Sequence, residues 1–250
     1  AHTIVTSTKA YADKIMAHGH RAAFALPLRV GVYEDEQGVN TAFVNPASLN
    51  RTILGDDIEK QLSVTTMNQL SDILALGAKG VIVNEQIGQL RSKGKIGGMG
   101  GGDFDKKIDE MYSEAFSVNA FQATAQKVKE GILANNQGWK LVYALAFGDP
   151  PTVIYGVNKA DMESKAFKIA GEKRESESNS CPGIDHVSAF PIEVIVYKDG
   201  DQVKVATLDG MYRMKLYFED AGMWAFMKNM RMPGQIQGEI VEMSTSLLKK

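Results

Sequence analysis

The chain has 250 residues, of which 44% are hydrophobic, a formal net charge of −2 and an isoelectric point near 6.1. This length fits one large domain or two of ordinary size, and the hydrophobic fraction is enough for a buried core. The near-neutral charge gives no electrostatic footprint for nucleic acid, and the apolar runs fall far short of the roughly 20 residues that span a bilayer. We therefore expect neither a nucleic-acid partner nor a membrane span.

Cysteine usage and the first residue bear on the compartment. Cys181 is the only cysteine, which excludes an intrachain disulfide. The sequence starts at Ala1, as a mature protein does after a signal peptidase has cut behind a small residue. We expect a periplasmic or extracellular protein whose core needs no disulfide.

Residue periodicity in the first part of the chain predicts a strand, a helix, a hairpin and further helices. Thr8 offers a hydroxyl that caps the first helix, and Gly55-Asp56 divides the last helical stretch in two. The predicted elements are a strand at 4–7, a helix that ends near Gly19, hairpin strands at 28–34 and 39–44, helices between 46 and 76, and a short strand at 81–83.

A glycine-rich segment follows, with six glycines between residues 94 and 102. So dense a cluster is typical of a connector and not of a regular element. It does not have the GxxxxGK[ST] pattern of a phosphate-binding loop, and no apolar strand leads directly into it.

The rest of the chain predicts a longer series of elements, with a charged, solvated loop at 172–179. They are a helix at 103–113, a strand at 114–119, an amphipathic helix at 120–133, strands at 140–147 and 152–157, a helix at 159–170, a second hairpin, and one or two helices at 211–230 that end before Pro233-Gly234.

An internal repeat organises these elements. Residues 25–42 recur 164 positions later as residues 189–206, with eight of the eighteen positions identical. We predict an α+β fold of two pseudo-symmetric copies of a small α/β sandwich, each built on a β-hairpin packed by helices. The first copy lacks the opening elements of the second, so it is truncated at its start. The predicted division is a partial unit at 1–92, a connector at 93–102 and a second unit at 103–250.

The first hairpin carries a family resemblance. Leu26-Pro27-Leu28-Arg29-Val30-Gly31-Val32-Tyr33-Glu34-Asp35, followed by Gly38 and Asn45-Pro46, resembles the family catalogued as domain of unknown function 302 (DUF302). Lys9-Ala10-Tyr11-Ala12 is similar to the family's helix before the hairpin.

The resemblance covers residues 3–54 well and residues 114–230 more weakly. In the second stretch Phe190-Pro191-Ile192-Glu193-Val194 departs from the pattern, and Asp209-Gly210 replaces Asn45-Pro46. The resemblance implies a small α+β fold that is often dimeric. It implies no settled activity and carries no catalytic residues.

Residues of metal-binding type gather before the two hairpins. His18, His20, Cys181 and His186 all lie within ten residues of the proline that opens a hairpin. Imidazole and thiolate are the ligands of zinc, copper and haem iron, so two copies that meet at a seam predict a shared metal or cofactor site. The alternative is that the histidines end a helix and Cys181 lies in a turn, because no recognised metal spacing is present.

A second group of candidate ligands is made of methionines near the end of the chain. Thioethers bind Cu(I), but methionines at helical spacing, interleaved with Trp224 and Phe226, are also typical of a core or interface helix. The methionines of this group are Met211, Met214, Met223, Met227, Met230 and Met232.

No catalytic signature is present. Glu34 and Asp35 are ordinary charges at a hairpin turn, and no Ser-His-Asp or Cys-His pairing is recognisable, so the sequence favours a non-catalytic protein. The first hypothesis is an exported protein that binds a small ligand, metal or haem at the seam between the copies. The alternative is a structural or assembly protein that self-associates into a homo-oligomer or filament. An enzyme stays open as a third hypothesis, which requires a pocket with a convergent nucleophile and base.

Overall fold

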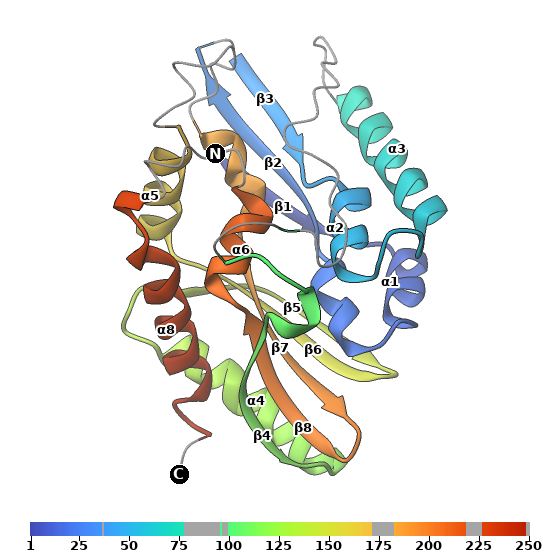
Figure 1. The fold of residues 1–250 in the computed structure, drawn as a ribbon, viewed down its shortest axis with the longest axis vertical. Coiled ribbons are helices and arrows are strands. Elements are labelled where there is room, and N and C mark those ends of the chain that lie inside the picture. Colours follow the sequence, from blue (N-terminus) through green and yellow to red (C-terminus); the bar gives the residue numbers. More distant parts are fainter. Residues whose placement is uncertain (37, 78–95, 97–99, 172–182, 219–226, 249–250) are drawn as a thin grey trace.

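The computed structural model describes residues 1–36, 38–77, 96, 100–171, 183–218 and 227–248. Helices and strands are mixed, and the strands form two separate antiparallel sheets (Figure 1). The α+β class predicted from the sequence is therefore confirmed. The predictions for residues 81–83 and 172–179 lie outside the described residues.

The first sheet has the strand order β1-β2-β3, with the hairpin β2-β3 in the predicted position. Helices α1, α2 and α3 lie beside this sheet (Figure 1). The elements of this first unit are β1 (His2–Thr6), α1 (Lys9–Met16), the 3-10 helix η1 (His20–Ala25), β2 (Leu28–Asp35), β3 (Gly38–Phe43), α2 (Pro46–Ile53) and α3 (Lys60–Gly77).

Capping residues set where the first helices begin. The hydroxyl of Thr8 accepts the Tyr11 amide at 3.1 Å, as predicted for the start of α1. The Asn45 side chain caps α2 in the same way, by accepting amides of its first turn. Gly55, at a φ of +130°, separates α2 from α3, a conformation that glycine adopts without a side-chain clash.

The second sheet has the order β4-β8-β7-β6-β5, and every neighbouring pair is antiparallel. The elements of this second unit are the 3-10 helix η2 (Phe104–Lys106), β4 (Ile108–Ala115), α4 (Val118–Ala134), β5 (Lys140–Gly148), β6 (Pro151–Asn158), α5 (Ala160–Gly171), the 3-10 helix η4 (Ile184–Ala189), β7 (Ile192–Asp199), β8 (Gln202–Leu208), α6 (Gly210–Tyr217) and α8 (Arg231–Thr245).

Two predictions for the start of this unit are wrong. Residues 103–113 form no α-helix, because Asp103 caps only the three-residue 3-10 helix η2 and β4 then begins at Ile108. The predicted strand at 114–119 therefore begins earlier and ends at Ala115. Pairing along β8 outweighs local helix propensity in this segment, since strand formation depends on the neighbouring strand.

The predicted helix end before Pro233-Gly234 is also wrong. Helix α8 runs through both residues and continues to Thr245. Pro233 stands in the first turn of α8, where a helix makes no use of the backbone N–H that proline lacks.

The connector predicted at 93–102 is described only in part. Ile96 is buried in a hydrophobic core built by residues of both units and forms an isolated antiparallel bridge with Gly102. The amide of Gly102 donates to the Ile96 carbonyl at 2.9 Å. These residues are therefore packed against the fold, although the glycine density predicts no regular element.

Elements of the two units stand at the spacing of the sequence repeat. Helices η1 and η4, strands β2 and β7, and helices α2 and α6 each begin and end 164 residues apart. Strand β1 pairs with β2 in the same way as β6 pairs with β7. Ile4 of β1 is opposite Val30, and Tyr155 of β6 is opposite Val194, the residue 164 positions after Val30. Within the described residues, β4, α4 and β5 have no counterpart in the first unit.

The second sheet is covered on both faces. Ile195 and Tyr197 of β7 pack into one core with residues of η1, α1 and α2, whereas Val194 and Val196 pack into another with α4 and α8. The contact is reciprocal, because β2 of the first unit packs on η4 and β7 of the second packs on η1. We call this double contact the seam.

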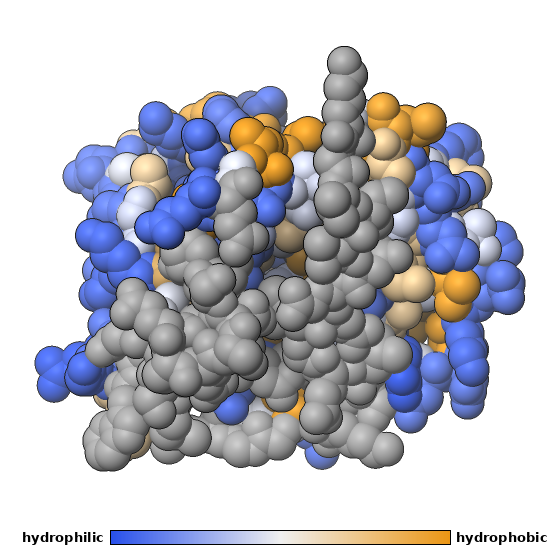
Figure 2. Space-filling view, turned by 90° about the horizontal axis from the view of Figure 1, so that it is seen from above, coloured by the Kyte–Doolittle hydropathy of each residue, from blue (hydrophilic) through white to orange (hydrophobic). Residues whose placement is uncertain are grey.

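The surface carries hydrophobic side chains in several places. In the view from above, small groups of hydrophobic residues lie between hydrophilic ones (Figure 2). Exposed examples are Ile73 and Leu76 on α3 and Val142 on β5. Among the described residues, no helix combines the length and the apolar character that crossing a membrane requires.

Candidate functional site

A buried ion pair crosses the seam at the two positions related by the repeat. Arg29 of β2 and Glu193 of β7 are 164 residues apart, and Arg29 Nη2 donates to Glu193 Oε1. Their side chains are 0% and 4% exposed. The hydroxyl of Tyr143 also donates to this carboxylate oxygen, at 3.3 Å, and Arg29 Nη1 donates to the hydroxyl of Tyr217 at 2.7 Å.

A second guanidinium, that of Arg213 in α6, joins this group. Its carbon Cζ lies 4.7 Å from the centre of the Tyr217 ring, and Arg29 Cζ lies 5.1 Å from the same centre. Arg213 is only 5% exposed. Its guanidinium is nevertheless charged, because arginine stays protonated in proteins throughout the accessible pH range. The group therefore holds two cations and one carboxylate.

The pKa values follow from burial and from Glu193. Burial disfavours the cation at Arg29 most strongly, but the Glu193 carboxylate together with Tyr217 and Tyr143 outweighs burial and holds the pKa of Arg29 above its usual range. Burial lowers the pKa of Arg213, and Glu193 only partly offsets this. Burial, followed by the Glu193 carboxylate, raises the pKa of Tyr143 well above its ordinary value, so this phenol stays protonated and donates.

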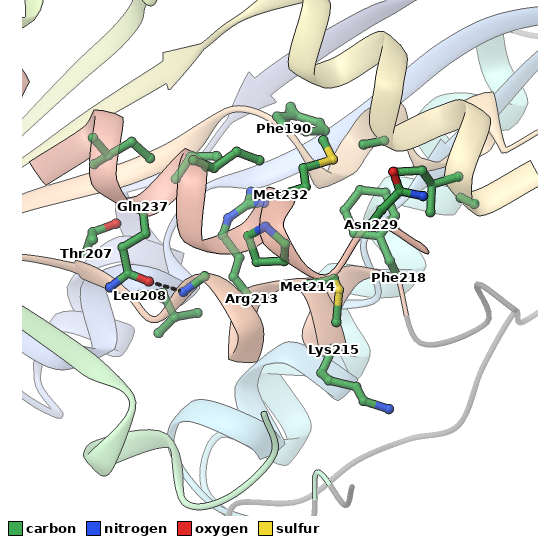
Figure 3. A pocket seen from close by; sticks show the side chains of 18 residues that line it. Phe190, Thr207, Leu208, Arg213, Met214, Lys215, Phe218, Asn229, Met232 and Gln237 are labelled. Carbon is green, nitrogen blue, oxygen red and sulfur yellow. Dashed lines mark hydrogen bonds between the residues drawn. The ribbon is translucent and has the colours of Figure 1, made fainter. Parts of the chain in front are cut away.

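A cavity of about 160 Å³ lies beside this group, inside the second unit. Its wall is formed by α5, the segment that leads into β7, the end of β8, α6 and α8 (Figure 3). The apolar residues that line it include Ala166, Ile169, Ala170, Phe190, Ile192, Leu208, Met214, Phe218, Met232, Pro233, Ile236 and Ile240.

Polar groups are few among the described lining residues. The hydroxyl of Thr207 donates to the Glu193 carbonyl at 2.8 Å, and the Gln237 side chain binds the Gly210 amide and Asp109. Arg213 binds backbone carbonyls through Nη2, those of Ala189 and Pro191, whereas its Nε is buried without a hydrogen-bond partner.

The elements that build the cavity explain its position. The side chain of Asp209 caps α6 by accepting the Tyr212 amide at 2.8 Å, so this helix begins directly after β8. Arg213 stands one turn into α6, which places it between the sheet and α8. Helix α8 closes the other side, where Met232 and Pro233 of its first turn contribute to the wall.

The histidines predicted as metal ligands have separate partners. His18 Nε2 lies 3.1 Å from Glu59 Oε1 near the surface. His20 stacks on the Tyr197 ring at 4.1 Å across the seam. His186 stacks on Phe218 at 5.0 Å, and its Nδ1 lies 3.0 Å from Asp185 Oδ1.

The predicted metal site therefore gains no geometric support from the part of the chain that is described. Cys181 lies outside those residues. Within them, no three side chains of His, Cys, Asp or Glu gather as a metal centre requires. The site at His18, His20, Cys181 and His186, with zinc, copper or haem, stays a prediction.

The methionine group divides in two. Met214 and Met232 line the cavity, and Met232 is buried. Met227 and Met230 are exposed, so they are not core residues of this chain. The packing interpretation allows a core or an interface, and for these two methionines it leaves the interface. Met223 lies outside the described residues.

Comparison with known proteins finds a likeness among solved structures only. No family model matches the sequence, and no curated protein matches it. Among solved structures, the chain is similar to an uncharacterized conserved DUF302 protein from Bacillus stearothermophilus. The two are 12% identical with a TM-score of 0.34, over 54% of this chain and 96% of that chain. A DUF302 protein is thus a structural neighbour, and the tandem pair of such units stays a prediction.

Proposed function

We propose that the chain is a non-catalytic binding protein that holds one small, largely apolar molecule in the cavity between α5, α6 and α8. The supporting observation is a cavity of about 160 Å³ with a predominantly apolar wall. An engineered apolar cavity of about 150 Å³ takes up benzene, so this space fits a ligand of one six-membered ring. The seam hypothesis places the ligand in the seam itself, whereas this cavity lies beside the seam.

The close packing of the seam explains why the ligand space lies elsewhere. A Cβ atom added at Gly31 of β2 would lie 2.3 Å from Val187 Cγ1 in η4. The ion pair of Arg29 and Glu193 fills the neighbouring contact. Side chains of the two units therefore already occupy the surfaces that the seam hypothesis assigns to a ligand.

Methyl NMR of the methionines tests the proposal at residue level. The protein is labelled with 13C at the methionine methyl groups and titrated with toluene. We expect the signals of Met214 and Met232 to shift and those of the exposed Met227 and Met230 to stay in place. Each methyl signal is assigned with a single Met→Leu variant. The absence of a saturable change in the signals of Met214 and Met232 would contradict the proposal.

A cavity-filling variant provides the control for location. Ala166 on α5 lines the cavity, so Ala166→Leu is expected to weaken toluene binding by occupying the space. Ser164 lies exposed on the same helix, so Ser164→Leu is expected to leave the affinity unchanged. Equal affinities of the two variants would place the ligand outside this cavity.

The tandem arrangement is part of the same proposal. The coincident element bounds at a spacing of 164 residues, and the equivalent pairing of β1 and β6, support two copies of one unit. The exported location, the metal site and self-association into a homo-oligomer stay predictions. Metal analysis of the natively purified protein and light scattering over a range of concentrations test the last two.

A further inference from the structure

We propose that the ligand of this cavity is a small organic anion, a single ring or short chain with one carboxylate, and that Arg213 binds the carboxylate. The inference rests on the proposed binding function, because it names the class of ligand for the same cavity. Three independent features of the site carry it: the charge balance, the free donor and the size of the space.

Within the described residues, the charge balance leaves one buried cation without a counter-ion of its own. The charged groups that act on Arg213 are Glu193 and Arg29. Arg29 already binds Glu193 directly, so this carboxylate neutralises one guanidinium of the two. A buried ion without a partner is costly, because the protein interior solvates it poorly. A bound anion would make the group neutral.

The hydrogen bonds of Arg213 leave part of its guanidinium without a partner. Its Nη2 is used by the carbonyls of Ala189 and Pro191, the second at 3.2 Å, but its Nε has no partner. The guanidinium lies among the side chains that line the cavity, whereas the amine of Lys215 points away from them (Figure 3). No Asp or Glu is among the described lining residues, so none there opposes an anion.

The space restricts the rest of the ligand. The apolar wall favours a hydrocarbon body, and the volume matches about one aromatic ring. A small aromatic or branched aliphatic carboxylate combines this body with one planar anion, and a guanidinium is suited to bind such a group. Benzoate is the probe that meets both requirements, and benzyl alcohol is its neutral match in size.

The first experiment compares these two probes on the full-length protein. Dissociation constants are measured by titration with detection at the Met214 and Met232 methyl groups. A hydrogen bond to a charged partner contributes enough to make benzoate bind about 10- to 100-fold more tightly than benzyl alcohol. Binding of both probes with equal affinity would overturn the anion inference and leave the binding function standing. Binding of neither probe would overturn the binding function itself.

Variants assign the preference to Arg213. Arg213→Met is expected to abolish the preference for benzoate while benzyl alcohol still binds. The control is Arg231→Met, which removes the same charge from an exposed position on α8 and is expected to leave both affinities unchanged. A benzoate preference that survives in Arg213→Met would overturn the assignment.

A third variant reports on the charge balance and does not depend on whether Arg213→Met folds. Glu193→Gln keeps the shape of the side chain but removes the carboxylate that competes with the ligand. We expect benzoate to bind more tightly to this variant and benzyl alcohol to bind unchanged. A purely structural role of Arg213 predicts no gain in benzoate affinity, so an unchanged or reduced benzoate affinity would count against the proposal.

Discussion

Removal of Glu193 is the most informative perturbation of stability, because this residue carries the only carboxylate of the buried group formed with Arg29 and Arg213. Glu193→Gln leaves two guanidiniums, 0% and 5% exposed, without a counter-charge from the part of the chain that the structure describes. Arg29→Met has a different consequence, because Glu193 then remains to balance Arg213. The structure therefore predicts an asymmetry: loss of the anion costs more stability than loss of the cation.

The magnitude follows from the burial of the pair. Breaking a buried ion pair by removal of one partner costs about 3–5 kcal/mol, and we expect Glu193→Gln to reach this range. For a chain of this size, each kcal/mol corresponds to about 2–4 °C in melting temperature, so the loss is about 6–20 °C. Arg29→Met is expected to cost less, because it deletes hydrogen bonds and ring contacts but leaves a neutral group.

Denaturant unfolding of the two single variants and of the double variant is the assay. The double variant leaves Arg213 as the only buried ion and is expected to lie between the two single variants in stability. An Arg29→Met variant that is less stable than Glu193→Gln would refute the reasoning, because it would mean that the second guanidinium does not contribute to the electrostatics of the pair.

Two further predictions concern pH and packing. Burial lowers the pKa of His20 in the folded protein, so the unfolded chain takes up the proton first as the pH falls. Stability is therefore expected to fall as the pH drops below about 6.5 and to level off below the pKa of the folded state. His20→Phe keeps a ring on Tyr197 and should flatten this slope when unfolding is measured at several pH values. A persistent slope in His20→Phe would assign it to other groups. Gly131→Ala on α4 should destabilise the protein by about 1–3 kcal/mol, because the added Cβ would lie 2.3 Å from a backbone oxygen of α8. Gly238→Ala on the open face of α8 should instead stabilise it by up to about 1 kcal/mol. Melting temperatures of the two variants that move in the same direction would contradict the α4–α8 contact.

Much of the fold follows from local patterns. In the sequence, Leu28, Val30 and Val32 alternate with other residue types along the first hairpin strand, and caps such as Thr8 mark helix starts, so these elements are predictable from short stretches. The segment at 103–113 is not, because β4 exists only by pairing with β8, which lies about a hundred residues further on. The path of α8 through Pro233 depends on a position within one turn of a helix start, which periodicity alone does not fix.

The candidate site was predictable only in part. Arg29 and Glu193 occupy the same position of the repeat with opposite charge, each between two apolar residues, and this contrast is a signal in the sequence for a contact between the copies. Arg213 gives no such signal, because an arginine on a helix is more often solvated than buried. Its burial depends on how α8 covers α6, and this is a tertiary contact between segments that the sequence does not relate.

The repeat itself suggests why Arg213 is where it is. The position 164 residues earlier, in the equivalent helix α2, is Leu49, which is buried in a hydrophobic core. Arg213→Leu would thus give the second unit the residue that its counterpart uses for packing. The substitution removes the uncompensated buried cation, which is favourable, but it leaves the carbonyls of Ala189 and Pro191 without a donor, at a cost of about 1–3 kcal/mol.

If these effects offset each other, Arg213→Leu will unfold within about 1 kcal/mol of the wild-type protein while its affinity for benzoate is lost. Such a result would mean that the guanidinium is retained for the ligand and not for the fold. A loss of stability near about 4 kcal/mol, typical of a broken structural ion contact, would assign Arg213 to the scaffold instead, because the fold would then depend on the cation even with the cavity empty.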